Sequence, residues 1–107
     1  MKSGFGLPEH ILQAIIKELQ KREKVNRAVI FGSRARGDYR YNSDIDLAVY
    51  SEGKLPAELR LDLDEAAGIY KIDIVDINST VDEKLRQRIK EQGVEIYIRD
   101  SAVEISK

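Results

Sequence analysis

The residues best suited to chemistry are two aspartates two positions apart, Asp44 and Asp46, in the otherwise apolar segment 43–49. Because side chains alternate along a β-strand, both carboxylates point to the same face of an extended segment. Like charges so close repel each other, and without compensation one carboxyl would have a raised pKa. Mg²⁺ would remove this conflict, since it binds a few carboxylates together with substrate phosphates. The pair predicts a site for one or two Mg²⁺ ions that stabilise a phosphoryl displacement.

A glycine–serine turn precedes the aspartates. Gly32 and Ser33 follow the apolar run 25–31, and the glycine permits an unusual backbone angle and a close approach of the backbone to a ligand. Backbone N–H groups in such a turn, with the Ser33 hydroxyl, can cradle phosphate oxygens. Arg34 and Arg36 are placed to neutralise the charge of a triphosphate. The turn therefore predicts a phosphate-binding segment beside the carboxylates.

Either feature alone is weak evidence, because paired aspartates and glycine–serine turns also serve purely structural purposes. Ten residues separate Ser33 from Asp44, and it is this combination that is specific. Residues 21–40 carry a net charge of +5 within a chain of net charge −1, which suits an anionic ligand. Charges scattered over a solvated helix and loop would explain the same count, and the overall charge does not favour direct nucleic-acid binding.

Alternating helices and strands must position these residues. Apolar spacing predicts helices over 7–24, 57–70 and from a cap at 78–80 to about 92, where Gly93 ends the last one. Strands are expected over 25–31, 44–50, 71–77 and 94–99, followed by a tail over 100–107. The pattern indicates an α/β or α+β fold, in which helices pack on a small mixed β-sheet of about four strands. Residues 1–107 are expected to form a single domain.

Composition excludes several classes of protein. The 107 residues include no cysteine, so disulfides and zinc–thiolate sites are ruled out. No apolar run approaches the roughly 20 residues that cross a bilayer, and the first ten residues lack the apolar stretch of a signal peptide. We therefore expect a cytoplasmic protein that does not interact with membranes.

The segment 32–49, GSRARGDYRYNSDIDLAV, resembles the signature of the polymerase-β-like nucleotidyltransferase superfamily and looks most like its minimal nucleotidyltransferases. The resemblance implies the nucleotidyltransferase fold and a Mg²⁺-dependent transfer of AMP from ATP to an acceptor hydroxyl. It implies that Gly32 and Ser33 bind the nucleotide phosphates. It further implies that Asp44 and Asp46 hold magnesium.

The superfamily also uses a third carboxylate on a neighbouring strand, as a metal ligand and possible general base, for which Asp73 and Asp76 are candidates. They stand three apart, so in a regular strand they face opposite ways and only one can join the site. Asp73 lies between two isoleucines, where an unpaired charge would be costly. A turn or capping role would explain Asp76. We therefore assign Asp73 to the site as a metal ligand and catalytic residue.

The resemblance also implies a partner. Minimal nucleotidyltransferases are often paired with HEPN proteins, small helical RNases, as antitoxin and toxin in one complex, and AMP transfer to a toxin tyrosine silences the toxin. Two alternatives stay open: a subunit that modifies a small molecule at an acceptor site supplied by a partner, and an antitoxin that acts by binding alone. Charged residues of the later helices are interpreted as solvated faces: Asp62, Asp64, Glu65, Lys84, Arg86, Arg88 and Lys90.

Overall fold

A four-stranded mixed sheet forms the centre of the protein in the computed structural model, which describes residues 4–79 and 82–99. The strands are β1 (Val25–Phe31), β2 (Ile45–Ser51), β3 (Ile72–Asp76) and β4 (Val94–Ile98), and their order across the sheet is β3-β2-β1-β4. β1 runs antiparallel to β2 and β4, while β2 and β3 are parallel. The predicted mixed sheet of about four strands is confirmed.

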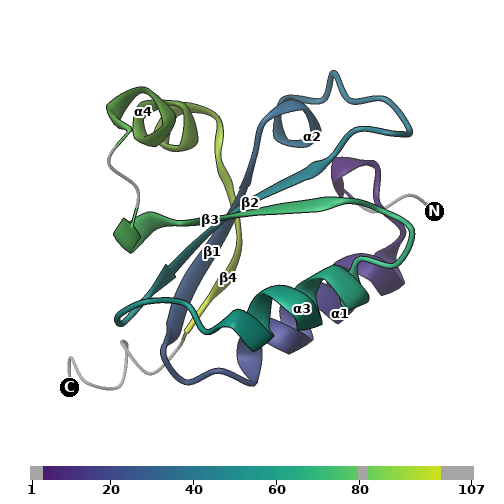
Figure 1. The fold of residues 1–107 in the computed structure, drawn as a ribbon. Coiled ribbons are helices and arrows are strands. Elements are labelled where there is room, and N and C mark those ends of the chain that lie inside the picture. The colour runs from purple at the N-terminus through teal and green to yellow at the C-terminus, as the bar shows by residue number, and fades with distance from the viewer. Residues whose placement is uncertain (1–3, 80–81, 100–107) are drawn as a thin grey trace.

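Helices cover both faces of this sheet (Figure 1). α1 (Glu9–Gln20) and α3 (Ala57–Ala66) lie side by side on one face, and α4 (Glu83–Gln92) lies on the other face. The short α2 (Ser33–Arg36) follows β1, and two 3₁₀ turns occupy Gly4–Gly6 and Ile77–Ser79. None of the helices described in residues 4–79 and 82–99 has the length and apolar character needed to cross a membrane.

The alternation of β2 sends its two sets of side chains into different layers. Ile45, Leu47 and Val49 are buried in the main apolar core with residues of α1 and α3. Ala48, on the opposite face, packs with Val29 and other residues of a second, smaller core beneath α4. Asp46 shares its face of the strand with Ala48, so the period of two places this carboxylate on the α4 side of the sheet.

All of the expected helices and strands are present, and most of them have different ends. α1 begins at Glu9, two residues later than predicted, with Pro8 as its N-cap, and it ends at Gln20, four residues earlier than predicted. The cap of α4 was wrongly placed at 78–80: Asp82 caps the helix, and its carboxylate accepts from the backbone N–H groups of Lys84 and Leu85. Residue 80 and the tail 100–107 lie outside the described residues. Gly93 does end α4, because its backbone turns to extended angles (φ −68°, ψ 144°) after its N–H has donated to the Ile89 carbonyl.

Candidate functional site

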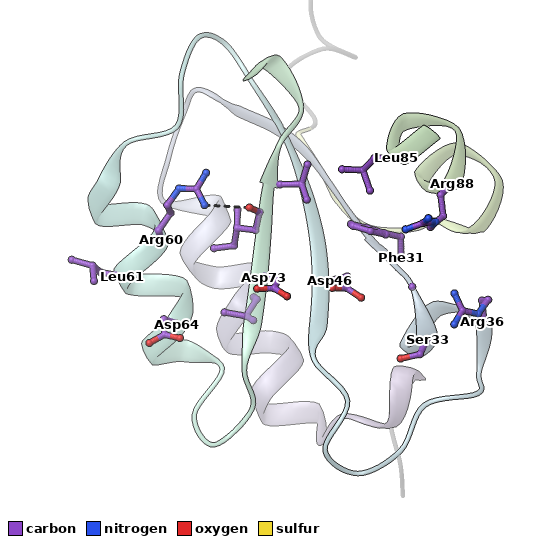
Figure 2. A pocket seen from close by; sticks show the side chains of 14 residues that line it. Phe31, Ser33, Arg36, Asp46, Arg60, Leu61, Asp64, Asp73, Leu85 and Arg88 are labelled. Carbon is purple, nitrogen blue, oxygen red and sulfur yellow. Dashed lines mark hydrogen bonds between the residues drawn. The ribbon is translucent and has the colours of Figure 1, made fainter. Parts of the chain in front are cut away.

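A cleft of about 930 Å³ opens at the end of the sheet where β1 ends and β2 and β3 begin (Figure 2). Five of the seven residues predicted for the site line it, and the other lining residues come from β1, β3, α3 and α4. The five are Gly32, Ser33, Arg36, Asp46 and Asp73. The fold therefore brings the glycine–serine turn and two of the three predicted carboxylates to one cavity.

Asp46 and Asp73 are neighbours because of strand register. They are direct partners in the parallel pairing of β2 with β3, so their side chains stand on the same face of the sheet. Burial raises the pKa of Asp46, and the negative charges of Asp73 and Asp44 raise it further, against the opposing effect of Arg36 and Arg88. The charged form of Asp46 is therefore disfavoured, first by burial and then by its acidic neighbours, and a bound cation would relieve this.

Asp44 lies farther from the cleft than Asp46 does. It directly precedes β2, is half-buried and does not line the cleft, although its charge acts on Asp46. Within residues 4–79 and 82–99, no three acidic, histidine or cysteine side chains are clustered as a metal site. The available donors are carboxylate oxygens, which are the ligands that Mg²⁺ prefers. Magnesium binding by Asp44, Asp46 and Asp73 stays a prediction.

Gly32 is required by the close approach of Asp46. Its φ of 79° lies in the region that favours glycine, and a Cβ added there would overlap the Asp46 carboxylate oxygen Oδ2. The same residue begins the α2 turn, where its carbonyl accepts from the N–H groups of Ala35 and Arg36. The glycine thus lets the turn that carries Ser33 and the strand that carries Asp46 meet at one wall of the cleft.

Arg34 does not line the cleft, and the structure gives no support to its predicted contact with a nucleotide. The side chain is 2% exposed. Its Nε and Nη2 donate to the Ser43 carbonyl at 3.2 and 2.9 Å, and its Nη1 donates to the Phe5 carbonyl at 2.9 Å. The guanidinium also lies over the rings of Tyr39 and Tyr70. Arg34 therefore joins the loop between α2 and β2, through Ser43, to the N-terminal turn, through Phe5.

Asp76 has the structural role that the sequence left open for it. It is buried, and its carboxylate accepts from the backbone N–H groups of Leu55 and Asn78 and from the Ser79 hydroxyl. Asp73, in contrast, is exposed on the cleft side of β3, which is an edge strand. The choice of Asp73 over Asp76 agrees with these positions, but the reason given was wrong, because Asp73 is not enclosed by its isoleucine neighbours.

Residues from two helices complete the cleft and were missed in the sequence. Arg60, Leu61 and Asp64 of α3 line one side, and Leu85 and Arg88 of α4 line the other (Figure 2). The positive charge of Arg88 lowers the pKa of Asp46, as does that of Arg36, so both guanidinium groups act on the carboxylate site. The sequence signal was ambiguous, since Arg88 is one of several cations on a strongly charged helix.

We expect Arg88→Ala to raise the KM for the nucleoside triphosphate about tenfold, with a smaller change in kcat. The variant would remove a charge-assisted contact that we expect with the phosphates of the bound triphosphate, which would form before the reaction starts. Steady-state kinetics over a range of triphosphate concentrations would measure the effect. Lys84→Ala is the matched control, because Lys84 is an exposed cation of the same helix that does not line the cleft. Equal KM values for the two variants would contradict a phosphate-binding role.

Comparison with known proteins identifies the family. The family model described as "Polymerase beta, Nucleotidyltransferase" matches residues 13–102, most of the chain. The chain belongs to this nucleotidyltransferase family. A curated relative from Methanocaldococcus jannaschii, named "Putative protein adenylyltransferase", is 37% identical to this nucleotidyltransferase over 76 residues, which cover 67% of this chain and 80% of that protein.

Solved structures of similar fold come from toxin–antitoxin complexes. One, described as a toxin–antitoxin with AMP-PNP, matches with a TM-score of 0.70 and 30% identity over 88% of this nucleotidyltransferase and 78% of that chain. Another, the Shewanella oneidensis complex of a tri-AMPylated HEPN toxin with its MNT antitoxin, matches with a TM-score of 0.63 and 26% identity over 89% and 76% of the two chains. These matches confirm the predicted fold and the resemblance to minimal nucleotidyltransferases.

Proposed function

We propose that this nucleotidyltransferase moves AMP from ATP to a tyrosine hydroxyl of a HEPN-domain protein and so acts as an antitoxin by adenylylation. The observation that carries the proposal is the register of Asp46 and Asp73 beside the Gly32–Ser33 turn in one open cleft. Relatives supply the rest of the support. One is named for protein adenylylation, one was solved with AMP-PNP, and one was solved with an AMPylated HEPN toxin.

Different residues of the cleft bind different parts of the triphosphate and its metal. The backbone of the Gly32–Ser33 turn and the Ser33 hydroxyl hold phosphate oxygens, while Arg36 and Arg88 neutralise their charge. Asp44, Asp46 and Asp73 would hold Mg²⁺, which when bound supplies positive charge to the phosphate undergoing transfer. Catalysis then depends mainly on positioning and on charge stabilisation in the transition state.

Asp73 is the residue best placed to assist the acceptor. It is exposed on the edge strand, at the side of the cleft away from the glycine–serine turn, and it accepts the proton of the incoming hydroxyl. The hydroxyl oxygen forms a bond to the α-phosphorus, the bond to the leaving oxygen breaks in line, and pyrophosphate departs. The product is a phosphodiester between AMP and the acceptor side chain.

Two other functions fit the site less well. A small polycationic acceptor, as in aminoglycoside modification, would be favoured by acidic walls. Apart from the carboxylate pair, however, the charged residues that line the cleft are Arg36, Arg60 and Arg88 against the single acid Asp64. An antitoxin that acts by contact alone would not need Asp46 to be held at a raised pKa beside two other carboxylates, which is a cost to folding.

The test is to incubate the protein with a candidate HEPN-domain partner, ATP and Mg²⁺, and to measure the intact mass of that partner. We expect a gain of one or more adenylate units, located on a tyrosine by peptide mapping, and no gain after Mg²⁺ is chelated. Asp44→Asn should abolish the gain while leaving the fold intact. A partner that is neutralised equally well by the Asp44→Asn variant, without a gain in mass, would refute the enzymatic mechanism in favour of binding alone.

A further inference from the structure

A second cavity of about 360 Å³ lies on the same face of the sheet as the cleft, beneath the other side of α4. Its strand residues are Arg27 and Val29 of β1 and Tyr50 of β2, whereas the cleft begins farther along β1 at Phe31. Helix α4 stands between the two, because Leu85 and Arg88 line the cleft while Arg86 and Lys90 line the second cavity. The cavity is therefore separate from the proposed catalytic site.

Positive charge dominates this cavity. Arg86 and Lys90 stand four positions apart, so they share one face of α4 and both reach the same cavity. Arg86 Nη2 donates to the Ile77 carbonyl at 2.8 Å, which orients its guanidinium. Arg27 is the third cation, and its Nε is paired with Glu95 Oε1 at 2.6 Å. Among the described residues no carboxylate lines the cavity, so Arg86 and Lys90 are placed to attract an anion.

The remaining lining is an arginine–tyrosine pair above an apolar floor. The Arg27 guanidinium lies over the ring of Tyr50 at 4.8 Å from its centroid, which forms a planar wall of a cation on an aromatic ring. Val29, Ile77 and Ile89, all buried, supply an apolar floor. A planar wall beside two cations suits a ligand that joins a flat ring to a phosphate group, because guanidinium planes and aromatic rings both stack on nucleobases.

We propose that this second cavity binds one phosphate-bearing nucleotide unit, whose phosphate contacts Arg86 and Lys90 and whose base stacks against the wall formed by Arg27 and Tyr50. The cavity volume is within the range of small-ligand pockets. A free mononucleotide and a unit of a single-stranded RNA share this chemistry. Because α4 also carries Arg88 into the catalytic cleft, an occupant of this cavity contacts the helix that forms one wall of that cleft.

The test is an NMR titration of the whole protein with AMP in the absence of divalent cations. We expect saturable shifts of the backbone amides of Val29, Tyr50, Lys90 and Gly93, separable from any shifts at Ser33 and Asp73 in the cleft. Lys90→Glu should weaken the binding seen at the cavity amides about tenfold, because it replaces a phosphate contact with a like charge. Lys84→Glu is the matched control on the same helix and should leave that binding unchanged.

A second titration with a trinucleotide RNA separates the two sources of the ligand. Tighter binding of the RNA than of AMP at the cavity amides would assign the site to single-stranded RNA. Equal or weaker binding would assign it to a free nucleotide. Shifts confined to the cleft amides for both probes would overturn the proposal. So would equal cavity affinities for the Lys90→Glu and Lys84→Glu variants. Neither result depends on AMP transfer, so the antitoxin proposal is tested separately.

Discussion

Asp46→Asn is expected to lower the rate of AMP transfer about a thousandfold, the loss typical of removing a charge from a preorganised phosphoryl-transfer site. Asn keeps the size and shape of the side chain, so the close packing against Gly32 is preserved. What is lost is one of the charges that would hold Mg²⁺ between β2 and β3. The measurement is the initial rate at which the partner gains adenylate, at saturating ATP and Mg²⁺.

The same variant should be at least as stable as the parent protein at neutral pH. Burial and the charges of Asp73 and Asp44 raise the pKa of Asp46, so the folded state binds its proton more tightly than the unfolded chain does. Stability therefore falls as the pH rises from the ordinary aspartate pKa through the raised pKa of the folded state. Asn has no proton to lose, so the advantage of the variant should disappear below about pH 3. Urea unfolding without divalent cations would measure it.

Asp64→Asn is the control for this prediction. Asp64 lines the same cleft from α3 but is not part of the proposed carboxylate set, so its replacement should change the transfer rate by less than about threefold. Comparable losses in the two variants would mean that the overall charge of the cleft matters and not the position of Asp46. A marked loss of stability at pH 7 in Asp46→Asn would contradict the view that this carboxylate is held at a cost to folding.

The part of the site that lies within one short segment could be predicted from the sequence. Gly32, Ser33 and Asp46 are separated by few residues, and local rules fix the turn and the face on which the aspartate stands. Local rules could not predict the pairing of Asp46 with Asp73, since it depends on the parallel register of β2 and β3, which a helix separates in the sequence. The family resemblance supplied that third carboxylate, and periodicity alone would not have done so.

The contributions of helix faces could not be predicted in the same way. Arg88 is one of six charged residues among the ten of α4, so the pattern does not show which charge faces the sheet. Which charge faces the sheet is decided only by the packing of α4 on the face that Phe31 and Ala48 share. Sequence reasoning also misjudged burial along β3, because an edge strand exposes Asp73 while a following turn encloses Asp76.

The second large effect concerns stability: Arg34→Ala should lower the free energy of unfolding by about 3 kcal/mol. The guanidinium makes its hydrogen bonds to backbone carbonyls, and its loss leaves the carbonyls of Ser43 and Phe5 without these donors in a half-buried region. Its cation–π contacts with Tyr39 and Tyr70 are lost as well. Urea unfolding monitored by circular dichroism would give the difference from the parent protein.

Arg36→Ala separates this role from phosphate binding. Arg36 stands two residues away in α2, is exposed and lines the cleft, so its removal should cost less than about 0.5 kcal/mol of stability yet raise the KM for ATP. Arg34→Lys keeps the charge but lacks the planar fork that reaches Ser43 and Phe5 together, so we expect it to recover little of the lost stability. Full recovery by lysine would show that charge alone matters at this position. An unchanged stability in Arg34→Ala would contradict the view that Arg34 holds the loop between α2 and β2 in place.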